Sequence, residues 1–134
     1  MFNRKASNYK SKPDEIIKTI NLKSGQKIAD IGAGGGYFSL RFAEIVGEKG
    51  RVYSVDTNSK FLKFIREVAD EKGFNNVVTV FVEEDKLELS KKNLDYIFMR
   101  NISHHLSNRI SYFENLRKCL NTDGRVIIIE YKKE

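Results

Sequence analysis

The chain has 134 residues, a length that supports one domain with its own core. Hydrophobic residues make up 40% and charged residues 31%, which is typical of a soluble globular domain. No stretch approaches the roughly 20 apolar residues of a membrane-spanning helix, and residues 1–7 lack the apolar core of a signal peptide. We therefore expect a cytoplasmic protein without membrane contact. The single cysteine, Cys119, excludes an internal disulfide and a cysteine metal cluster, and we predict that it is a buried apolar residue and that the chain has no metal site.

The net charge of +6 comes from 24 basic and 18 acidic residues and raises the question of nucleic-acid binding. The excess is concentrated in residues 1–12, which carry Arg4, Lys5, Lys10 and Lys12 and no acid. Elsewhere the two signs are interspersed, without an arginine-rich stripe or a basic segment that carries stacking aromatics. We therefore expect a solvated surface and a flexible basic arm at residues 1–12, while nucleic acid stays a partner that no motif supports.

Hydrophobic spacing predicts helices and strands in alternation. The first half of the chain predicts a helix from Pro13, a strand at 27–31, a helix after Gly36 and a strand at 51–55 that leads into Asp56. The second half predicts a helix that Gly73 ends, a strand at 77–82, a polar loop at 83–93, a strand at 94–99, a helix through 110–120, a turn at 123–124 and a strand at 125–131. The apolar residues that mark the last two helices are Phe61, Phe64, Ile65, Val68, Ile110, Phe113, Leu116 and Leu120.

This alternation implies right-handed crossovers and a parallel sheet with both faces covered. Open sheets of this kind bind ligands where the strand order reverses, and we place the first strand at that point. We therefore predict one α/β domain, residues 1–134, with a Rossmann-like doubly wound parallel sheet in the order 3-2-1-4-5.

The most informative segment is the turn after the first strand, which carries glycines at 32, 34 and 36. A strand that runs through glycines into a helix presents bare backbone and a helix N-terminus to a nucleotide-like ligand. A dinucleotide fingerprint has glycines at i, i+2 and i+5, whereas Tyr37 occupies that last position here. Asp30 precedes the first glycine, where a carboxylate would repel a diphosphate but would suit a ligand with an ammonium group.

At this point the sequence resembles class I S-adenosylmethionine-dependent methyltransferases, most closely their small-molecule, type 11-like branch. The resemblance covers about residues 13–131 and consists of six motifs in order. They are the glycine turn 30–36, Val55-Asp56, Glu84-Asp85 with Leu89, the fourth-strand segment 94–97, the histidine loop 101–106 and the fifth-strand segment 124–130. The resemblance implies an enzyme that transfers a methyl group from S-adenosylmethionine to a small-molecule acceptor.

The resemblance also implies roles for individual residues. Asp56 would hold both ribose hydroxyls, and Asp85 and Lys86 would hold the adenine ring. Asp30 would face the methionyl ammonium. The remaining expected cofactor-binding residues are Gly32, Ala33, Gly34, Gly36, Tyr37, Thr57, Arg100 and Asn101. We expect Asp95 to have a structural role, supporting the glycine turn from the neighbouring strand.

Methyl transfer from a sulfonium needs alignment and water exclusion, and it needs a general base only when the nucleophile carries a proton that must leave. His104 and His105 lie in the loop over the expected methyl group, so either is a candidate base, and the alternative is that one packs against the lid or caps the next helix.

The sequence departs from the family in one large respect, because it ends just after the fifth strand and lacks the usual strands six and seven. The fifth strand would then be an edge that could pair with another copy in a homo-oligomer, although Lys132 and Lys133 would weaken such pairing. Three alternatives stay open: methylation of RNA or protein, a nicotinamide oxidoreductase, and a non-catalytic interaction module with this fold.

Overall fold

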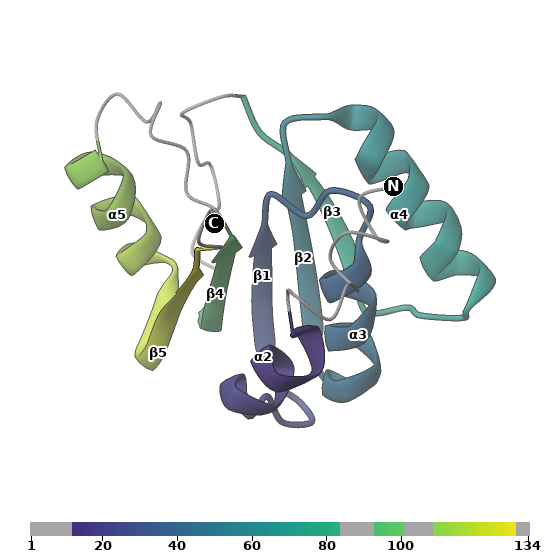
Figure 1. Ribbon diagram of the computed structural model, residues 1–134, viewed down its shortest axis with the longest axis horizontal. Helices are drawn as coiled ribbons and strands as arrows, with labels where there is room; N and C mark the ends of the chain where they lie inside the picture. The colour runs from purple at the N-terminus through teal and green to yellow at the C-terminus, as the bar shows by residue number, and fades with distance from the viewer. Residues whose placement is uncertain (1–11, 84–92, 101–108, 131–134) are drawn as a thin grey trace.

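The structure, a computed structural model, describes residues 12–83, 93–100 and 109–130. Its core is a five-stranded sheet in the order β3-β2-β1-β4-β5, in which every neighbouring pair is parallel (Figure 1). This order confirms the predicted doubly wound α/β fold. The described elements are α2 (Pro13–Ile20), β1 (Lys27–Ile31), α3 (Tyr37–Val46), β2 (Arg51–Asp56), α4 (Ser59–Glu71), β3 (Val77–Phe81), β4 (Leu94–Arg100), α5 (Arg109–Lys118) and β5 (Leu120–Ile129).

Helix α4 shows how local sequence sets the ends of these elements. The side chain of Asn58 accepts hydrogen bonds from the N–H groups of Lys60 and Phe61, at 2.9 and 3.4 Å, and so caps the first turn. Two residues beyond the last helical residue, Gly73 has a φ of 74°, a conformation that glycine adopts readily at the end of a helix. Leu62, Ile65 and Ala69 form the buried stripe of the helix. These features place the N-terminus of α4 just after β2, beside the glycine turn.

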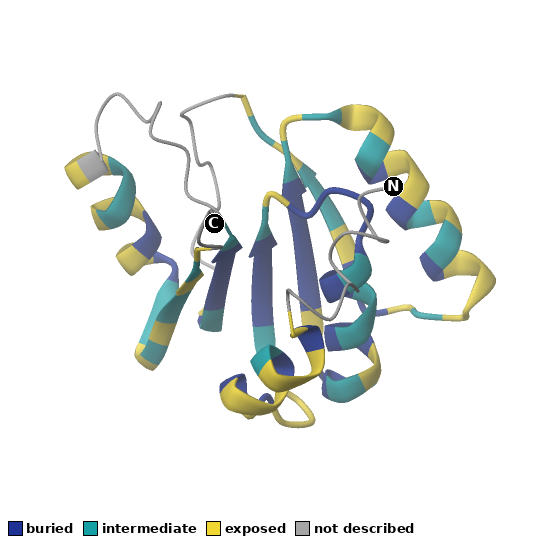
Figure 2. Ribbon diagram, viewed as in Figure 1, coloured by how far each residue is buried: buried dark blue, intermediate teal, exposed yellow. Residues whose placement is uncertain are grey.

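Two cores cover the two faces of the sheet. On one face α3 and α4 contribute Phe38, Phe42 and Ile65 to a core that includes Phe98 of β4, and Ile17 and Ile20 of α2 belong to the same core. On the other face Leu116 of α5 and Cys119, which is 3% exposed as predicted for a buried residue, pack with Ile97 and other residues of the sheet. Figure 2 shows the consequence: the central strands β1, β2 and β4 are largely buried, and the outer strands β3 and β5 are much less so.

The predicted start of the fifth strand was wrong. The expected turn at Asp123-Gly124 lies inside β5, which begins at Leu120 rather than at residue 125. Leu94 pairs with Leu120, whereas the next ladder pair joins Tyr96 and Arg125, so a register shift absorbs the intervening residues. Phe64 and Ile110, two of the apolar residues that mark these helices in the sequence, lie in α4 and α5 but are 47% and 75% exposed, because the helices turn neighbouring residues toward the sheet.

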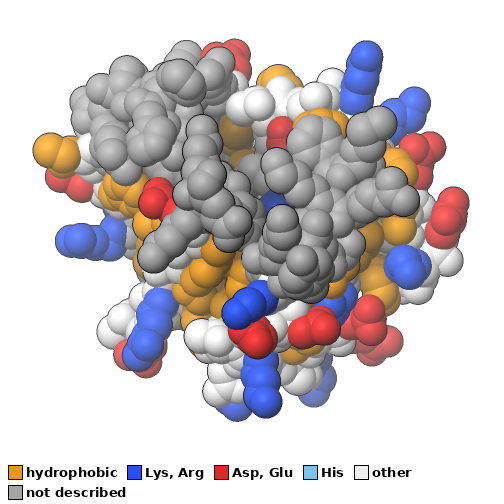
Figure 3. Space-filling model, in the orientation of Figure 1, with side chains coloured by type: hydrophobic (Ala, Val, Ile, Leu, Met, Phe, Trp, Pro, Cys, Tyr) orange, Lys and Arg blue, Asp and Glu red, His pale blue; other side chains and the backbone are white. Residues whose placement is uncertain are grey.

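Basic and acidic side chains are interspersed over the described surface that Figure 3 shows. None of the helices in the described ranges has the length and apolar character required to cross a membrane.

Candidate functional site

The turn between β1 and α3 is held against the end of β2 by backbone hydrogen bonds. The N–H groups of Gly32 and Ala33 both donate to the carbonyl of Val55, at 2.8 and 3.0 Å. Gly32, Gly34 and Gly36 have positive φ values of 77°, 57° and 86°. Residues with side chains rarely adopt this region, so the backbone path itself explains the repeated glycine that the sequence shows.

Two of these glycines face different surroundings. A Cβ atom on Gly36 would lie 2.7 Å from Cγ1 of Ile65 in α4, so this glycine allows the start of α3 to pack tightly against α4. A Cβ atom on Gly32 would meet nothing within 4 Å, and Gly32 is exposed. The backbone at Gly32 is therefore bare on a side from which a ligand can approach it.

Asp56, the last residue of β2, organises the same turn. One carboxylate oxygen, Oδ2, accepts a hydrogen bond from the N–H of Gly34 at 2.9 Å, and Oδ1 accepts from the N–H of Asn58 at 2.9 Å. A carboxylate has about four acceptor sites, so each oxygen can take a further donor. The carboxylate is half-buried, and Thr57 after it is exposed. Asp56 thus ties the glycine turn to the start of α4 and keeps capacity for a ligand.

Asp30 lies fully buried at the end of β1. Its Oδ2 accepts a hydrogen bond of 2.7 Å from the hydroxyl of Ser39 in α3, which in turn accepts one of 2.7 Å from the hydroxyl of Ser54 in β2. Its Oδ1 is buried and has no hydrogen-bond partner. Burial raises the pKa of the Asp30 carboxyl, and the positive charge of Arg100 and the hydrogen bond from Ser39 offset that rise only in part.

Arg100 brings the end of β4 to the same place. Its Nη2 donates to the carbonyl of Gly32 at 3.2 Å, and its guanidinium carbon lies 4.9 Å from the centre of the Phe38 ring. Its Nε is buried and has no hydrogen-bond partner. A buried donor on Arg100 and a buried acceptor on Asp30 therefore both remain unused beside the turn.

Tyr37 begins α3, and its hydroxyl accepts a hydrogen bond of 2.7 Å from Arg41. Arg41 also donates to Asp14 of α2 at 2.9 Å. This chain of contacts links the first turn of α3 to α2.

The structure brings together nine of the twelve residues expected to bind the cofactor. They are Asp30, Gly32, Ala33, Gly34, Gly36, Tyr37, Asp56, Thr57 and Arg100, at or next to the carboxyl ends of β1, β2 and β4. The other three, Asp85, Lys86 and Asn101, lie outside the described residues, as do the candidate bases His104 and His105. Sequence reasoning missed Ser39 and Ser54; the available signal was a hydroxyl at a position where the apolar pattern of each element calls for burial.

The expected support of the glycine turn by Asp95 is wrong. Asp95 accepts hydrogen bonds from the N–H of Lys27 at 2.8 Å and from the side chain of Asn121 at 2.7 Å. Both partners lie near the starts of β1 and β5, so Asp95 joins three strands at the amino end of the sheet. It is remote from the turn because parallel strands place their carboxyl ends at the opposite edge.

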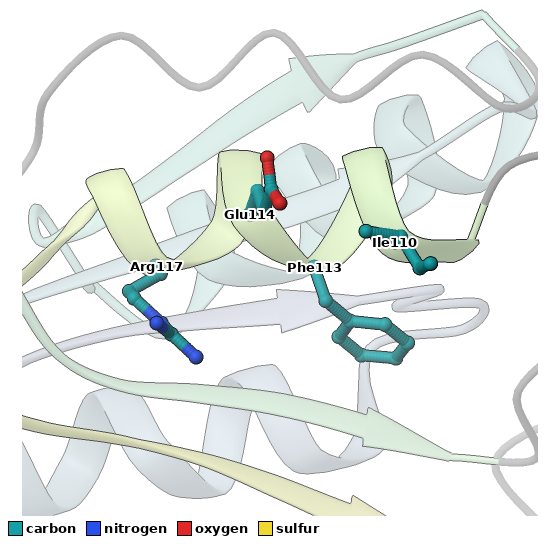
Figure 4. Close-up of a pocket in the computed structure, with 4 residues that line it drawn as sticks. All are labelled: Ile110, Phe113, Glu114 and Arg117. Atoms are coloured by element: carbon teal, nitrogen blue, oxygen red, sulfur yellow. The ribbon is translucent and has the colours of Figure 1, made fainter.

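A cavity of about 440 Å³ lies elsewhere, against α5 (Figure 4). The described residues that line it are Ile110, Phe113, Glu114 and Arg117 of that helix. Among the described residues, its lining includes no glycine of the turn and no residue predicted to bind a cofactor. The described candidate residues lie instead at the carboxyl edge of the sheet. Within the described ranges, no three His, Cys, Asp or Glu side chains gather as a metal site.

Comparisons with known proteins agree with this geometry. Two curated relatives, both named ubiquinone/menaquinone biosynthesis C-methyltransferase UbiE, come from Coxiella burnetii (26% identity over 121 residues, 90% of this chain and 48% of the relative) and Shewanella piezotolerans (28% over 118 residues, 87% and 47%). The chain thus spans about half the length of the curated relatives it matches. A solved SAM-dependent methyltransferase from Aquifex aeolicus has a TM-score of 0.80 and 32% identity, over 91% of this chain and 65% of that one. A family model described as a methyltransferase domain matches residues 22–134, and the chain belongs to that family.

Proposed function

We propose that this chain binds S-adenosylmethionine at the carboxyl ends of β1, β2 and β4 and transfers its methyl group to a small-molecule acceptor. The observation that carries the proposal is the pairing of two acids with the glycine turn. Asp56 accepts a hydrogen bond from the N–H of Gly34, while Asp30 lies buried in β1, just before the same turn, with one oxygen that has no hydrogen-bond partner. The bare backbone at Gly32 supplies the space that a nucleoside needs.

The residues present fit the chemical groups of this cofactor. The two oxygens of Asp56 suit the ribose hydroxyls, and the unused oxygen of Asp30 suits the methionyl ammonium, directly or through water. Backbone at Gly32, Ala33, Gly34 and Gly36 would contribute to holding the cofactor, and Tyr37, Thr57 and Arg100 would lie near it. We assign Asp85 and Lys86 to the adenine ring and Asn101 to the cofactor on the sequence motifs alone.

The bound cofactor supplies a methyl group on a sulfonium whose departure leaves a neutral thioether. The protein's task is therefore alignment of the acceptor and exclusion of water rather than stabilisation of a developing charge. His104 and His105 are the residues we propose as a general base, for an acceptor that must lose a proton.

A small-molecule acceptor is supported by the names of the curated relatives, which place those proteins in ubiquinone and menaquinone biosynthesis. Association of two copies through β5 stays a separate proposal, supported by the position of β5 at the edge of the described sheet. Sedimentation analysis would test it, since a monomer at high concentration contradicts it.

Calorimetric titration tests the proposed function. We expect binding of S-adenosylhomocysteine, the demethylated product, and no binding of NAD. Asp56→Ala should weaken the first interaction, whereas Glu67→Ala, which removes an exposed acid on α4, should leave it unchanged. Binding of NAD alone would instead support an oxidoreductase, and binding of neither ligand would support a non-catalytic module.

A further inference from the structure

Three polar side chains form a continuous buried line from β2 through α3 to β1. Ser54, Ser39 and Asp30 are all 0% exposed, and each of the two contacts between them is 2.7 Å long. Polar groups in such a position lower stability unless they are satisfied. Fold alone gives no reason for two buried serines here, because the residues beside Ser54 in β2 and beside Ser39 in α3 are mostly apolar.

The direction of the two hydrogen bonds follows from the number of protons available. A carboxylate oxygen only accepts, so the proton between Ser39 and Asp30 belongs to Ser39. A hydroxyl has one proton, and the contact between the serines must therefore use the proton of Ser54. Both hydrogen bonds therefore donate in the direction of Asp30. The one from Ser39 uses Oδ2 of Asp30, so Oδ1 is the oxygen left for a ligand.

We propose that Ser39 and Ser54 are positioning residues that keep Asp30 as an oriented carboxylate and thereby make the site selective for adenosyl ligands that carry an ammonium group. This inference rests on the proposed function and deepens it, because it assigns the selectivity for the amino-acid end of the ligand to residues that the ligand does not touch.

The electrostatic surroundings of Asp30 explain why such support is needed. Burial is the largest influence on its pKa and raises it. Among the described residues, Arg100 of β4 and the hydroxyl of Ser39 in α3 lower this pKa, Asp56 of β2 raises it, and the backbone of Ser39 lowers it slightly. Removal of the Ser39 hydroxyl therefore raises the pKa of Asp30 further. A protonated Asp30 has no charge with which to attract an ammonium group.

The test measures ligand binding and the ionisation of Asp30 independently. Affinities for S-adenosylhomocysteine and for 5′-methylthioadenosine, which lacks the amino-acid end, are measured by calorimetry from mildly acidic to mildly alkaline pH. The titration of the Asp30 carboxyl is followed by carbon NMR in the ligand-free protein. In the wild type we expect the affinity for S-adenosylhomocysteine to fall about tenfold per pH unit below the pKa of Asp30. The affinity for methylthioadenosine should not change across that range.

Ser39→Ala should move the midpoint of the S-adenosylhomocysteine profile and the NMR midpoint of Asp30 upward by the same amount, with methylthioadenosine binding unchanged. Ser54→Ala should move both in the same direction by less, because it acts through Ser39. Ser39→Thr keeps a hydroxyl and should restore the wild-type profile. Ser24→Ala removes an exposed hydroxyl in the turn before β1 and serves as the control.

Equal weakening of both ligands by Ser39→Ala, with neither midpoint moved, would show that the serines only fill space; the inference would then fail while the proposed function stands. Wild-type protein that binds neither ligand would overturn both. If Ser39→Ala does not fold, the same comparison on Ser54→Ala decides the matter, and unmoved midpoints there overturn the inference.

Discussion

Replacement of Gly36 by alanine should destabilise the protein through two separable effects. Gly36 has a φ of 86°, and a Cβ atom there would lie 2.7 Å from Cγ1 and 3.3 Å from Cδ1 of the fully buried Ile65. Gly25 offers a matched control because its φ is also 86° but its Cβ would meet nothing within 4 Å. Alanine at Gly25 therefore reports backbone strain alone, whereas alanine at Gly36 reports strain and collision together.

The magnitudes follow from these two contributions. Left-handed backbone costs an alanine about 1–2 kcal/mol, and the loss of unfolded-state entropy returns about 0.4–1 kcal/mol, so Gly25→Ala should cost about 1 kcal/mol. Overpacking in a full core adds about 1–3 kcal/mol, so Gly36→Ala should cost about 2–4 kcal/mol.

Urea unfolding of the ligand-free variants measures both values. The double variant with Ile65→Ala removes the colliding atoms, so Gly36→Ala should cost no more in that background than Gly25→Ala does in the wild type. Equal costs for Gly25→Ala and Gly36→Ala in the wild-type protein would refute the contact between the start of α3 and Ile65, and with it the argument for glycine at 36.

Four further predictions concern the acids and the exposed glycine. Gly32→Ala should lower the free energy of unfolding by about 1 kcal/mol, the cost of backbone strain alone. The same change should abolish measurable binding of S-adenosylhomocysteine, and normal binding would contradict our placement of the ligand. Asp56→Ala should weaken that binding by about 1.5–3 kcal/mol in calorimetry, because the ligand loses hydrogen bonds to a charged group. The same change should destabilise the ligand-free protein, because the buried N–H of Gly34 loses its acceptor. The free energy of unfolding of the ligand-free protein should fall as pH rises from 3.8 through the raised pKa of Asp30. In this pH range the folded state holds a proton on Asp30 that the unfolded state has released. Urea titrations at several pH values measure this decline, and Asp30→Asn should remove it. Asp95→Ala should cost about 1–3 kcal/mol in stability through its two lost partners, while S-adenosylhomocysteine affinity of the folded protein stays unchanged; a large loss of affinity would return Asp95 to the glycine turn.

The strand order could be predicted from sequence because each strand is a short apolar run that ends at a distinct signal. The run before residue 32 is followed by four glycines within five residues, and the run at 51–55 ends at an acid. We therefore expected the strand order to reverse at the first of these strands. A positive φ at Gly32, Gly34 and Gly36 is the physical reason why the chain needs glycine at those three positions.

The start of β5 could not be predicted, because it depends on a partner strand. Asp123-Gly124 has the composition of a turn. The strand nevertheless continues across it, because residues on both sides pair with β4. A Cβ atom on Gly124 would lie 2.7 Å from the carbonyl oxygen of Leu94, so the glycine serves a close approach to β4. The sequence shows a glycine at position 124, but it does not show whether the chain turns there or passes close to the neighbouring strand.

Asp30 and Asp95 show the limit for the candidate site. Each is an acid within an apolar strand, and residue type alone does not distinguish them. Their position along the strand does: Asp95 follows the first residue of β4, and Asp30 precedes the last residue of β1. Because all five described strands are parallel, Asp95 lies at the amino edge of the sheet and Asp30 at the carboxyl edge.

Hydrogen-bond capacity then separates the two acids in free-energy terms. Both oxygens of Asp95 accept from the chain itself, so folding already recovers what that carboxylate loses on leaving water. Asp30 is more deeply buried and has one oxygen without a partner, which leaves part of its desolvation cost unrecovered in the ligand-free protein. A fold tolerates such a cost where a ligand later removes it, and strain of this kind is concentrated at binding sites. The incomplete satisfaction of Asp30, together with the unused Nε of Arg100, is therefore a physical reason to place the binding site at the carboxyl edge that does not depend on any resemblance to other proteins.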